Sequence, residues 1–391
     1  MSEKAPRSGA AMLAKTPFKS LLWSLPMILL TWFMFTGGQG LPRDPLRLIP
    51  FVITIVLVNA VFFLALYTGR TDRWRAVIFV ITAVSFIISF ICNFQESRGS
   101  MSISEAEMIK GRVPFCHIVI PQTSVVTALT RTIIFPGSME GNYSITSMIV
   151  LWLGASLALG RGFCGWGCFF GGLEDGFSRI LKKPIIKRIP EKWTYLPYAV
   201  LVVVILASTA LLTPFYCEWL CPFKAVTEYA EVNSLVTFLQ TTVFLSLFAG
   251  LVVILPILTK RRTQCGLFCP MGAFQSCTNK IDPFEIRFDR DKCKDCGQCE
   301  QVCPTFSVSK NKLTNGNTRL SCIKCGKCVD VCAHGAATFH VKGTALDAKG
   351  SRGRMFFLFP AFLFLSIFGG FLIQDGLYRL LRLITMGSPI Q

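Results

Sequence analysis

Apolar stretches long enough to cross a lipid bilayer are the feature that most restricts how this 391-residue chain folds. A spanning helix needs about 20 predominantly apolar residues. Only 16% of the residues are charged, against about 25% in a typical soluble protein. Seven stretches have the required length, and they cover residues 17–38, 47–69, 75–94, 145–163, 196–215, 235–259 and 354–375. The sequence therefore predicts an α-helical polytopic membrane protein with about seven spans.

The distribution of basic residues predicts how these spans are oriented. The formal net charge of +18 is large enough to suggest a nucleic-acid partner. However, the Lys and Arg residues cluster in alternate connections, namely the N-terminal tail and residues 70–75, 181–192, 259–264 and 349–354. Because cytoplasmic connections carry the excess of basic residues, we expect these connections in the cytoplasm. The C-terminus then lies outside a bacterial or archaeal cytoplasmic membrane, and no nucleic-acid site is needed.

Two cysteine runs between the sixth and seventh stretches carry the most specific chemical signal. Residues 293–304 read CKDCGQCEQVCP and residues 322–332 read CIKCGKCVDVC. The spacing C-x2-C-x2-C-x3-C is that of bacterial ferredoxins, in which the fourth cysteine binds the other cluster. We therefore assign one [4Fe–4S] cluster to Cys293, Cys296, Cys299 and Cys332, and a second to Cys322, Cys325, Cys328 and Cys303. Zinc sites also use C-x2-C pairs, whereas disulfides are rare in the reducing cytoplasm.

These runs predict a small α+β two-cluster ferredoxin domain inserted over residues 282–342. The segment between the runs, FSVSKNKLTNGNTRL, is expected to form two short strands around a turn at Asn315–Gly316. The domain has more Lys and Arg than Asp and Glu. Such a face would attract an acidic electron donor or an anionic lipid surface.

Two further cysteine pairs form an internal repeat at the predicted cytoplasmic edge. The sequence RGFCGWGCFFGGLEDGFSRI (161–180) aligns with RTQCGLFCPMGAFQSCTNKI (262–281). Cysteines four apart fall on one face of a helical turn, so each pair presents two thiolates. Cys164, Cys168, Cys265 and Cys269 are therefore predicted to bind a third [4Fe–4S] cluster. A mononuclear metal and small buried cysteines are the alternatives. Cys277 is expected to be a buried structural thiol or a supporting ligand.

A third pair, in FYCEWLCPFKAV (215–226), is predicted on the outer side of the membrane. The topology places four thiols there at a common depth, and they are Cys92, Cys116, Cys217 and Cys221. These four are a hypothetical fourth cluster site, although packed cysteines or disulfides explain them as well. His117 is a candidate metal ligand or quinol partner, or an interfacial histidine. The apolar loop 113–136 is interpreted as a re-entrant or interfacial segment.

With these motifs in view, the chain resembles the NapH, NosR and CcoG group of polytopic membrane ferredoxins. The resemblance covers roughly residues 145–342 and rests on the repeated C-G-x-x-C pairs and the ferredoxin runs. It implies that the pairs Cys164/Cys168 and Cys265/Cys269 act together. It also implies membrane-bound electron transfer, from quinol or a reduced cytoplasmic donor toward an outer-side reductase. The N-terminal three spans, residues 95–144 and the seventh span fit the group less well.

The sequence thus predicts an electron conduit with four regions, which cover residues 1–144, 145–281, 282–342 and 343–391. Electrons would pass between the cytoplasmic ferredoxin domain and a membrane or outer-side acceptor through up to four [4Fe–4S] clusters. No nucleophile motif or nucleotide-binding loop is present, so we expect an electron-transfer subunit of an oxidoreductase complex. The alternatives are a quinol dehydrogenase subunit that reacts with quinone, and a CcoG-like assembly or regulatory factor.

Overall fold

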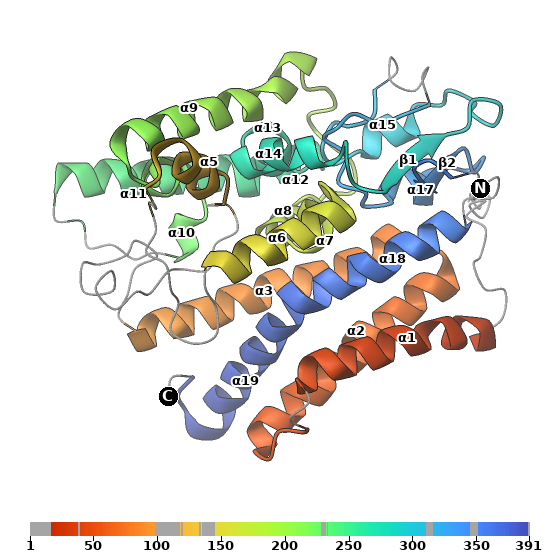
Figure 1. Cartoon of the computed structure of the whole chain (residues 1–391), viewed down its shortest axis with the longest axis horizontal. Helices are drawn as coiled ribbons and strands as arrows, with labels where there is room; N and C mark the ends of the chain where they lie inside the picture. The colour runs from red at the N-terminus through yellow and green to blue at the C-terminus, as the bar shows by residue number, and fades with distance from the viewer. Residues whose placement is uncertain are drawn as a thin grey trace.

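The computed structural model is a helical protein with one small sheet. It describes residues 17–37, 40–97, 118, 120–132, 134, 145–227, 232, 234–309, 316–344 and 351–389. Long helices run side by side, and the sheet lies at one end of them (Figure 1). This arrangement separates a polar end from an apolar body.

The helices from the two ends of the chain pack together as one group. They are α1 (Pro17–Thr36), α2 (Pro45–Thr68) and α3 (Thr71–Ser97), with α18 (Ser351–Leu365), η5 (Ser366–Gly370) and α19 (Phe371–Met386). Asp44 caps α2, because its side chain accepts the backbone N–H of Leu46 at 3.0 Å. The α19 helix packs against both α2 and α3. Phe62 and Phe362 are in edge contact in the shared core.

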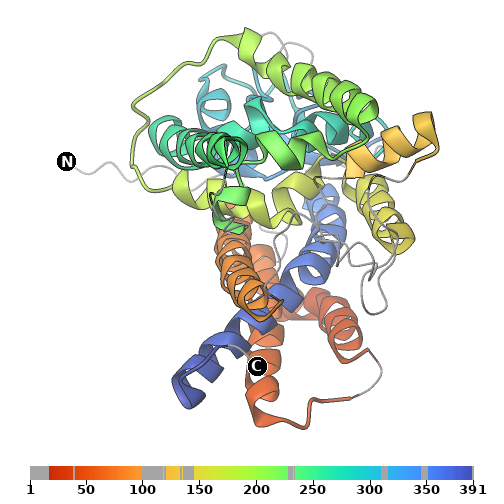
Figure 2. The same cartoon turned by 90° about the vertical axis from the view of Figure 1, so that its left-hand side faces the viewer.

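A second group of helices lies on the other side of the bundle, as Figure 2 shows nearly end-on. It contains α5 (Ile120–Thr130), η2 (Glu191–Tyr195), α9 (Leu196–Leu211), α11 (Leu235–Leu247), η4 (Phe248–Ile254) and α12 (Leu255–Thr259). Between the groups lie α6 (Ile145–Leu159), α7 (Gly162–Trp166), α8 (Phe169–Phe177), α13 (Thr263–Leu267) and α14 (Pro270–Thr278). The α8 helix packs on α3, and α14 packs on α9. The cysteine pairs of the internal repeat are therefore enclosed between the two groups.

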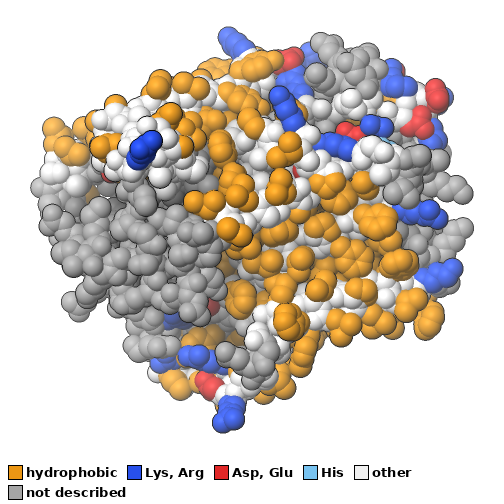
Figure 3. Space-filling model, viewed as in Figure 1, with side chains coloured by type: hydrophobic (Ala, Val, Ile, Leu, Met, Phe, Trp, Pro, Cys, Tyr) orange, Lys and Arg blue, Asp and Glu red, His pale blue; other side chains and the backbone are white. Residues whose placement is uncertain are grey.

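Helices of spanning length occur in most of the places where the sequence predicts them. Within the described residues, five helices are long and apolar enough to cross a membrane, and they are Pro17–Thr36, Pro45–Thr68, Glu191–Leu211, Leu235–Thr259 and Arg352–Met386. The shorter apolar helix 149–159 and the 27-residue helix α3 occupy the other two predicted stretches. Exposed apolar side chains form a broad face across the molecule, while Lys and Arg gather toward the end that holds the sheet (Figure 3).

The sheet belongs to the cysteine-rich region and corrects one prediction. Strand β1 (Phe284–Phe288) pairs antiparallel with β2 (Ala337–Val341). The strands thus flank the two runs, whereas we expected them between the runs. Between the runs, the described residues contain an isolated antiparallel bridge from Asn317 to Arg287 and a segment held by buried hydroxyls, such as Thr305 with Ser307 at 2.8 Å. Asn315, in the predicted turn, lies outside the described residues. The short helices α15 (Gln298–Val302) and α17 (Lys327–Val331) pack on each other.

Candidate iron–sulfur sites

The first ferredoxin run forms a cavity near the protein surface. Four thiols line it, and they are Cys293, Cys296, Cys299 and Cys332. Gly297, in the left-handed region at φ 72°, allows the turn before α15. The backbone N–H of Ala336 donates to Cys332 Sγ at 3.2 Å. Cys296 is exposed. The structure thus brings together the four residues that the sequence assigned to one cluster, at a solvent-accessible position.

The second ferredoxin run places its thiols deeper. Cys303 interacts electrostatically with the thiols of Cys322, Cys325 and Cys328. The backbone N–H of Ser307 donates to Cys303 Sγ at 3.2 Å. The crossed arrangement of fourth cysteines in the two runs is therefore present in the fold.

Burial keeps the unligated thiols of Cys299 and Cys325 protonated at neutral pH. It raises the pKa of Cys325 to about 12 and that of Cys299 to about 11. Iron binds the thiolate, so occupation of these sites releases protons.

Another cavity lies between the two helix groups. The four thiols of the internal repeat line it, and they are Cys164, Cys168, Cys265 and Cys269. Their local geometry corrects the sequence expectation of one helical turn for each pair. Cys164 lies in α7, whereas Cys168 is the extended N-cap of α8; Cys265 lies in α13, and Cys269 is the N-cap of α14. The helix break lets backbone N–H groups at the next helix start face the sulfur, as those of Gly171 and Gly272 do.

The two halves of the repeat hold each other through reciprocal arginine contacts. Arg161 Nη2 donates to the carbonyl of Cys265 at 2.9 Å. Arg262 Nη2 donates to the carbonyl of Cys164, also at 2.9 Å. Arg161 and Arg262 are separated in the sequence by the same number of residues as Cys164 and Cys265. The sequence repeat is thus a pair of related structural units around one cavity.

Gly171 is required by one of these contacts. A Cβ at Gly171 would lie 1.7 Å from Arg262 Nη2, whereas a Cβ at Gly176 in the same helix meets only Val80 at 3.5 Å. We predict that Gly171→Ala lowers stability by about 1–3 kcal/mol because the guanidinium must move. Gly176→Ala is the matched control and should leave stability near its original value. Thermal unfolding in detergent measures both, and equal midpoints for the two variants would contradict the prediction.

The third pair lies beside this cavity. Cys217 is in η3 (Tyr216–Leu220), and Cys221 is extended before α10 (Lys224–Thr227). Its φ of −79° and ψ of 107° resemble those of Cys168, at −78° and 102°. Tyr216 is fully buried, and its hydroxyl accepts from Gln264 Nε2 at 3.0 Å. It interacts electrostatically with Cys217, Cys221 and Cys269. The sequence predicted the third pair and the pair Cys265/Cys269 on opposite sides of the membrane. In the fold, Tyr216 connects the segments that carry them.

The remaining candidate residues have different outcomes. Cys92 is buried on α3, which packs against α10. Cys116 and His117 lie outside the described residues. Cys277 is exposed, which corrects the prediction of a buried thiol. On α14 the side chains of Gln275 and Ser276 are buried instead.

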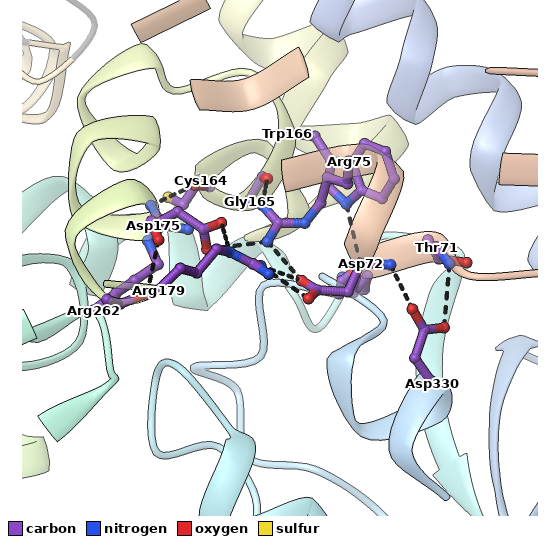
Figure 4. A network of polar contacts seen from close by, with 12 residues as sticks. Thr71, Asp72, Arg75, Cys164, Gly165, Trp166, Asp175, Arg179, Arg262 and Asp330 are labelled. Atoms are coloured by element: carbon purple, nitrogen blue, oxygen red, sulfur yellow. Dashed lines mark hydrogen bonds and ion pairs between the residues drawn. The ribbon is translucent and has the colours of Figure 1, made fainter. Parts of the chain in front are cut away.

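A buried charge network connects the repeat to α3. Arg75 donates to Asp72, to Asp175 and to the carbonyl of Gly165 at 2.8–3.0 Å (Figure 4). Arg179 donates to both aspartates. Sequence analysis did not single out these residues, because partners so distant in the chain have no local pattern.

The ferredoxin domain is fixed to the same region by two residues of its second run. Asp330 accepts the backbone N–H groups of Thr71 and Asp72 at 3.2 and 2.8 Å, and so caps α3. Burial raises the pKa of Asp330 to about 6. Lys324 donates to the carbonyl of Leu159 at 3.0 Å and to Asn279 Oδ1 at 2.6 Å, and within the domain it forms a buried ion pair with Asp282 at 2.9 Å. Asp330 and Lys324 lie within two residues of predicted cluster ligands, so the cluster-binding loop is also the docking loop.

The side chains around the four-thiol cavity, which is lined by Cys164, Cys168, Cys265 and Cys269, fit an anionic cluster bound by thiolates. Arg262 lines it, and its Nε and Nη1 have no hydrogen-bond partner among the described residues. A buried guanidinium with free donors favours a negatively charged neighbour. Among the residues that the structure describes, no three side chains of His, Cys, Asp or Glu lie close enough together to bind a single metal ion. The four thiols instead surround a space.

Comparison with known families agrees with this arrangement. Residues 285–333 match a family described as a 4Fe-4S dicluster domain. Residues 142–188, 194–234 and 241–288 each match a family described as a 4Fe-4S binding domain. The three latter matches contain the three membrane-region pairs in turn. The third pair therefore belongs to the same kind of unit as the other two.

Several relatives are similar to this chain over about half to two thirds of its length. MJ0750, an uncharacterized protein of Methanocaldococcus jannaschii, is 30% identical over 193 residues, which are 47% of this chain and 74% of the relative. The putative electron transport protein YccM of Escherichia coli is 26% identical over 264 residues, or 66% of this chain and 70% of YccM. The ferredoxin-type protein NapH of Haemophilus influenzae is 28% identical over 195 residues, or 48% and 64%. No solved structure matches.

Fold and sites together define a polytopic membrane protein with a ferredoxin domain. The chain belongs to the membrane ferredoxins of the NapH/NosR type, an iron–sulfur electron-transfer family with 4Fe-4S domains.

Proposed function

We propose that this chain conducts electrons between a cytoplasmic ferredoxin domain and an acceptor at the outer side of the membrane. The observation that carries the proposal is a continuous row of thiol sites. The row starts at exposed Cys296 and continues through the buried thiols of the second run. Cys325 then packs with Cys164 and Cys265 in one hydrophobic cluster. Tyr216 finally connects Cys269 to the third pair.

The clusters supply one-electron chemistry when bound, and the chain supplies thiolates, spacing and burial. We assign the ligands as the sequence did, with four sets of four cysteines. The loops that carry the second and third sets of cysteines are in direct contact. Trp166 Nε1, between Cys164 and Cys168, donates to the carbonyl of Lys324, beside Cys325, at 3.1 Å. A Cβ at Gly165 would lie 2.4 Å from the carbonyl of Ile323. The glycine in C-G-x-x-C thus allows the two backbones to approach closely.

The proposal includes a topology and partners. Helices α3 and α6 add to the five apolar helices, which gives seven spans with the ferredoxin domain in the cytoplasm and the C-terminus outside. The four regions have the boundaries given by the sequence. An acidic cytoplasmic donor and an outer-side reductase are the partners that this orientation favours.

Iron and acid-labile sulfide in anaerobically purified protein test the proposal. Four clusters require about 16 iron atoms per chain, and about 8 would contradict both membrane-region sites. The double variant Cys164→Ser/Cys265→Ser should lose about 4 iron atoms while the signals of the ferredoxin domain persist in the EPR spectrum. Exposed Cys277→Ser is the control and should lose none.

A further inference from the structure

Two buried arginines face the four-thiol cavity of the internal repeat. Arg161 and Arg262 are 1% and 0% exposed. Arg161 hydrogen-bonds the thiol of Cys265, and Arg262 lines the cavity. Two nitrogens of Arg262 and one of Arg161 have no hydrogen-bond partner in the part of the chain that the structure describes. Burying two cations in an apolar region is costly unless an anion lies close by.

The fold makes room for these two cations. A Cβ at Gly272 would lie 3.1 Å from Arg161 Nη2, as a Cβ at Gly171 would overlap Arg262. Ser276 and Asn279 hold Arg161 through its side chain and backbone, at 2.5 and 2.7 Å. Hydrogen bonds to the carbonyls of Cys265 and Cys164 also hold the guanidinium groups of Arg161 and Arg262 beside the cavity.

The two halves of the repeat differ in one ionisable group. Glu174 lines the cavity, with Oε2 3.9 Å from Arg262 Nε. Its carboxyl group accepts the backbone N–H groups of Gln264 and Cys265 at 2.6 and 3.1 Å. The equivalent position in the second half is Gln275. Burial raises the pKa of Glu174 to about 8, so this carboxyl group does not cancel the charges of the two arginines at neutral pH.

We propose that Arg161 and Arg262 raise the reduction potential of the cluster held by Cys164, Cys168, Cys265 and Cys269. This inference rests on the proposed function, since it requires a cluster in the cavity. Reduction adds one negative charge to a thiolate-bound cluster, and net charge and hydrogen bonds to sulfur set its potential. Fixed cations in a low-dielectric site stabilise the reduced state more than the oxidised state. The arginines are positioning residues and do not exchange electrons.

Redox titration followed by EPR tests the charge assignment. The signal of this cluster is identified as the one that disappears in Cys164→Ser/Cys265→Ser. We expect Arg262→Gln to lower its midpoint potential. Arg262→Lys keeps the charge and should stay closer to the unaltered protein than Arg262→Gln. Exposed Lys187→Gln loses the same charge far from the cavity and should not move the midpoint.

The outcomes separate the inference from the proposed function. If the unaltered protein lacks the iron of this site, the proposed function fails. If the iron is present and the midpoint of Arg262→Gln equals that of the unaltered protein, only the inference fails. A midpoint that is lower in Arg262→Gln and returns toward the original value in Arg262→Lys supports it, because damage to packing would not follow the charge of the side chain. Should Arg262→Gln not retain the cluster, the midpoint of Arg161→Gln decides, and it should also be lower than that of the unaltered protein.

Discussion

Replacing Lys324 with methionine is expected to loosen the ferredoxin domain from the membrane helices and to lower stability by about 3 kcal/mol. Lys324 is 2% exposed, and Nζ lies 2.9 Å from Asp282 Oδ2. The same nitrogen donates to the carbonyl of Leu159 at 3.0 Å and to Asn279 Oδ1 at 2.6 Å. Methionine preserves the length of the side chain but leaves a buried carboxylate without its main partner. Lys342, 3.5 Å from Asp282, offsets part of this loss.

Burial lowers the pKa of Lys324, and the ion pair with Asp282 opposes that shift. The charged form of Lys324 therefore depends on the carboxylate of Asp282, and the two side chains stabilise each other in the folded protein. Thermal unfolding in detergent, with the circular-dichroism midpoint as readout, measures the effect. Lys294→Met in the first run is the matched control because Lys294 is exposed. Equal midpoints for the two variants would show that the contact does not hold the domain.

Features set by short spacing could be predicted from the sequence. The crossed ferredoxin arrangement follows from C-x2-C-x2-C-x3-C, because a tight loop leaves the fourth cysteine, Cys303 or Cys332, facing the other run. Five of the predicted stretches coincide with long apolar helices, since hydropathy depends on neighbouring residues. The pairing of the two C-G-x-x-C elements, Cys164/Cys168 and Cys265/Cys269, followed from their repeated context.

Features set by packing between distant residues could not be predicted in this way. Asp72 and Arg75 lie at the start of α3, and their charges are buried by an ion pair with each other and with Asp175. The break between Cys164 and Cys168 depends on backbone donors at the next helix, which a helical spacing rule ignores. The contact of Tyr216 with Gln264 joins segments that the topology had placed on opposite sides.

That contact underlies the last prediction, which concerns the third pair. We expect the double variant Cys217→Ser/Cys221→Ser to lose about 4 iron atoms per chain. Serine is a poor ligand for cluster iron, and the second cysteine of this pair has the same extended geometry as Cys168. The cluster signals of the ferredoxin domain should persist, because Tyr216 and the third pair lie beyond the four-thiol cavity from that domain.

The neighbouring cavity gives this prediction a second readout. Tyr216 interacts electrostatically with Cys269 as well as with the third pair, so loss of the outer site should shift the midpoint potential of the inner cluster. Cys277→Ser controls for the loss of an exposed thiol and should change neither quantity. Full iron content together with an unchanged EPR spectrum in the double variant would remove the outer site from the conduit. The row of thiol sites would then end at Cys269, inside the protein, and electrons would have to leave the chain from the four-thiol cavity.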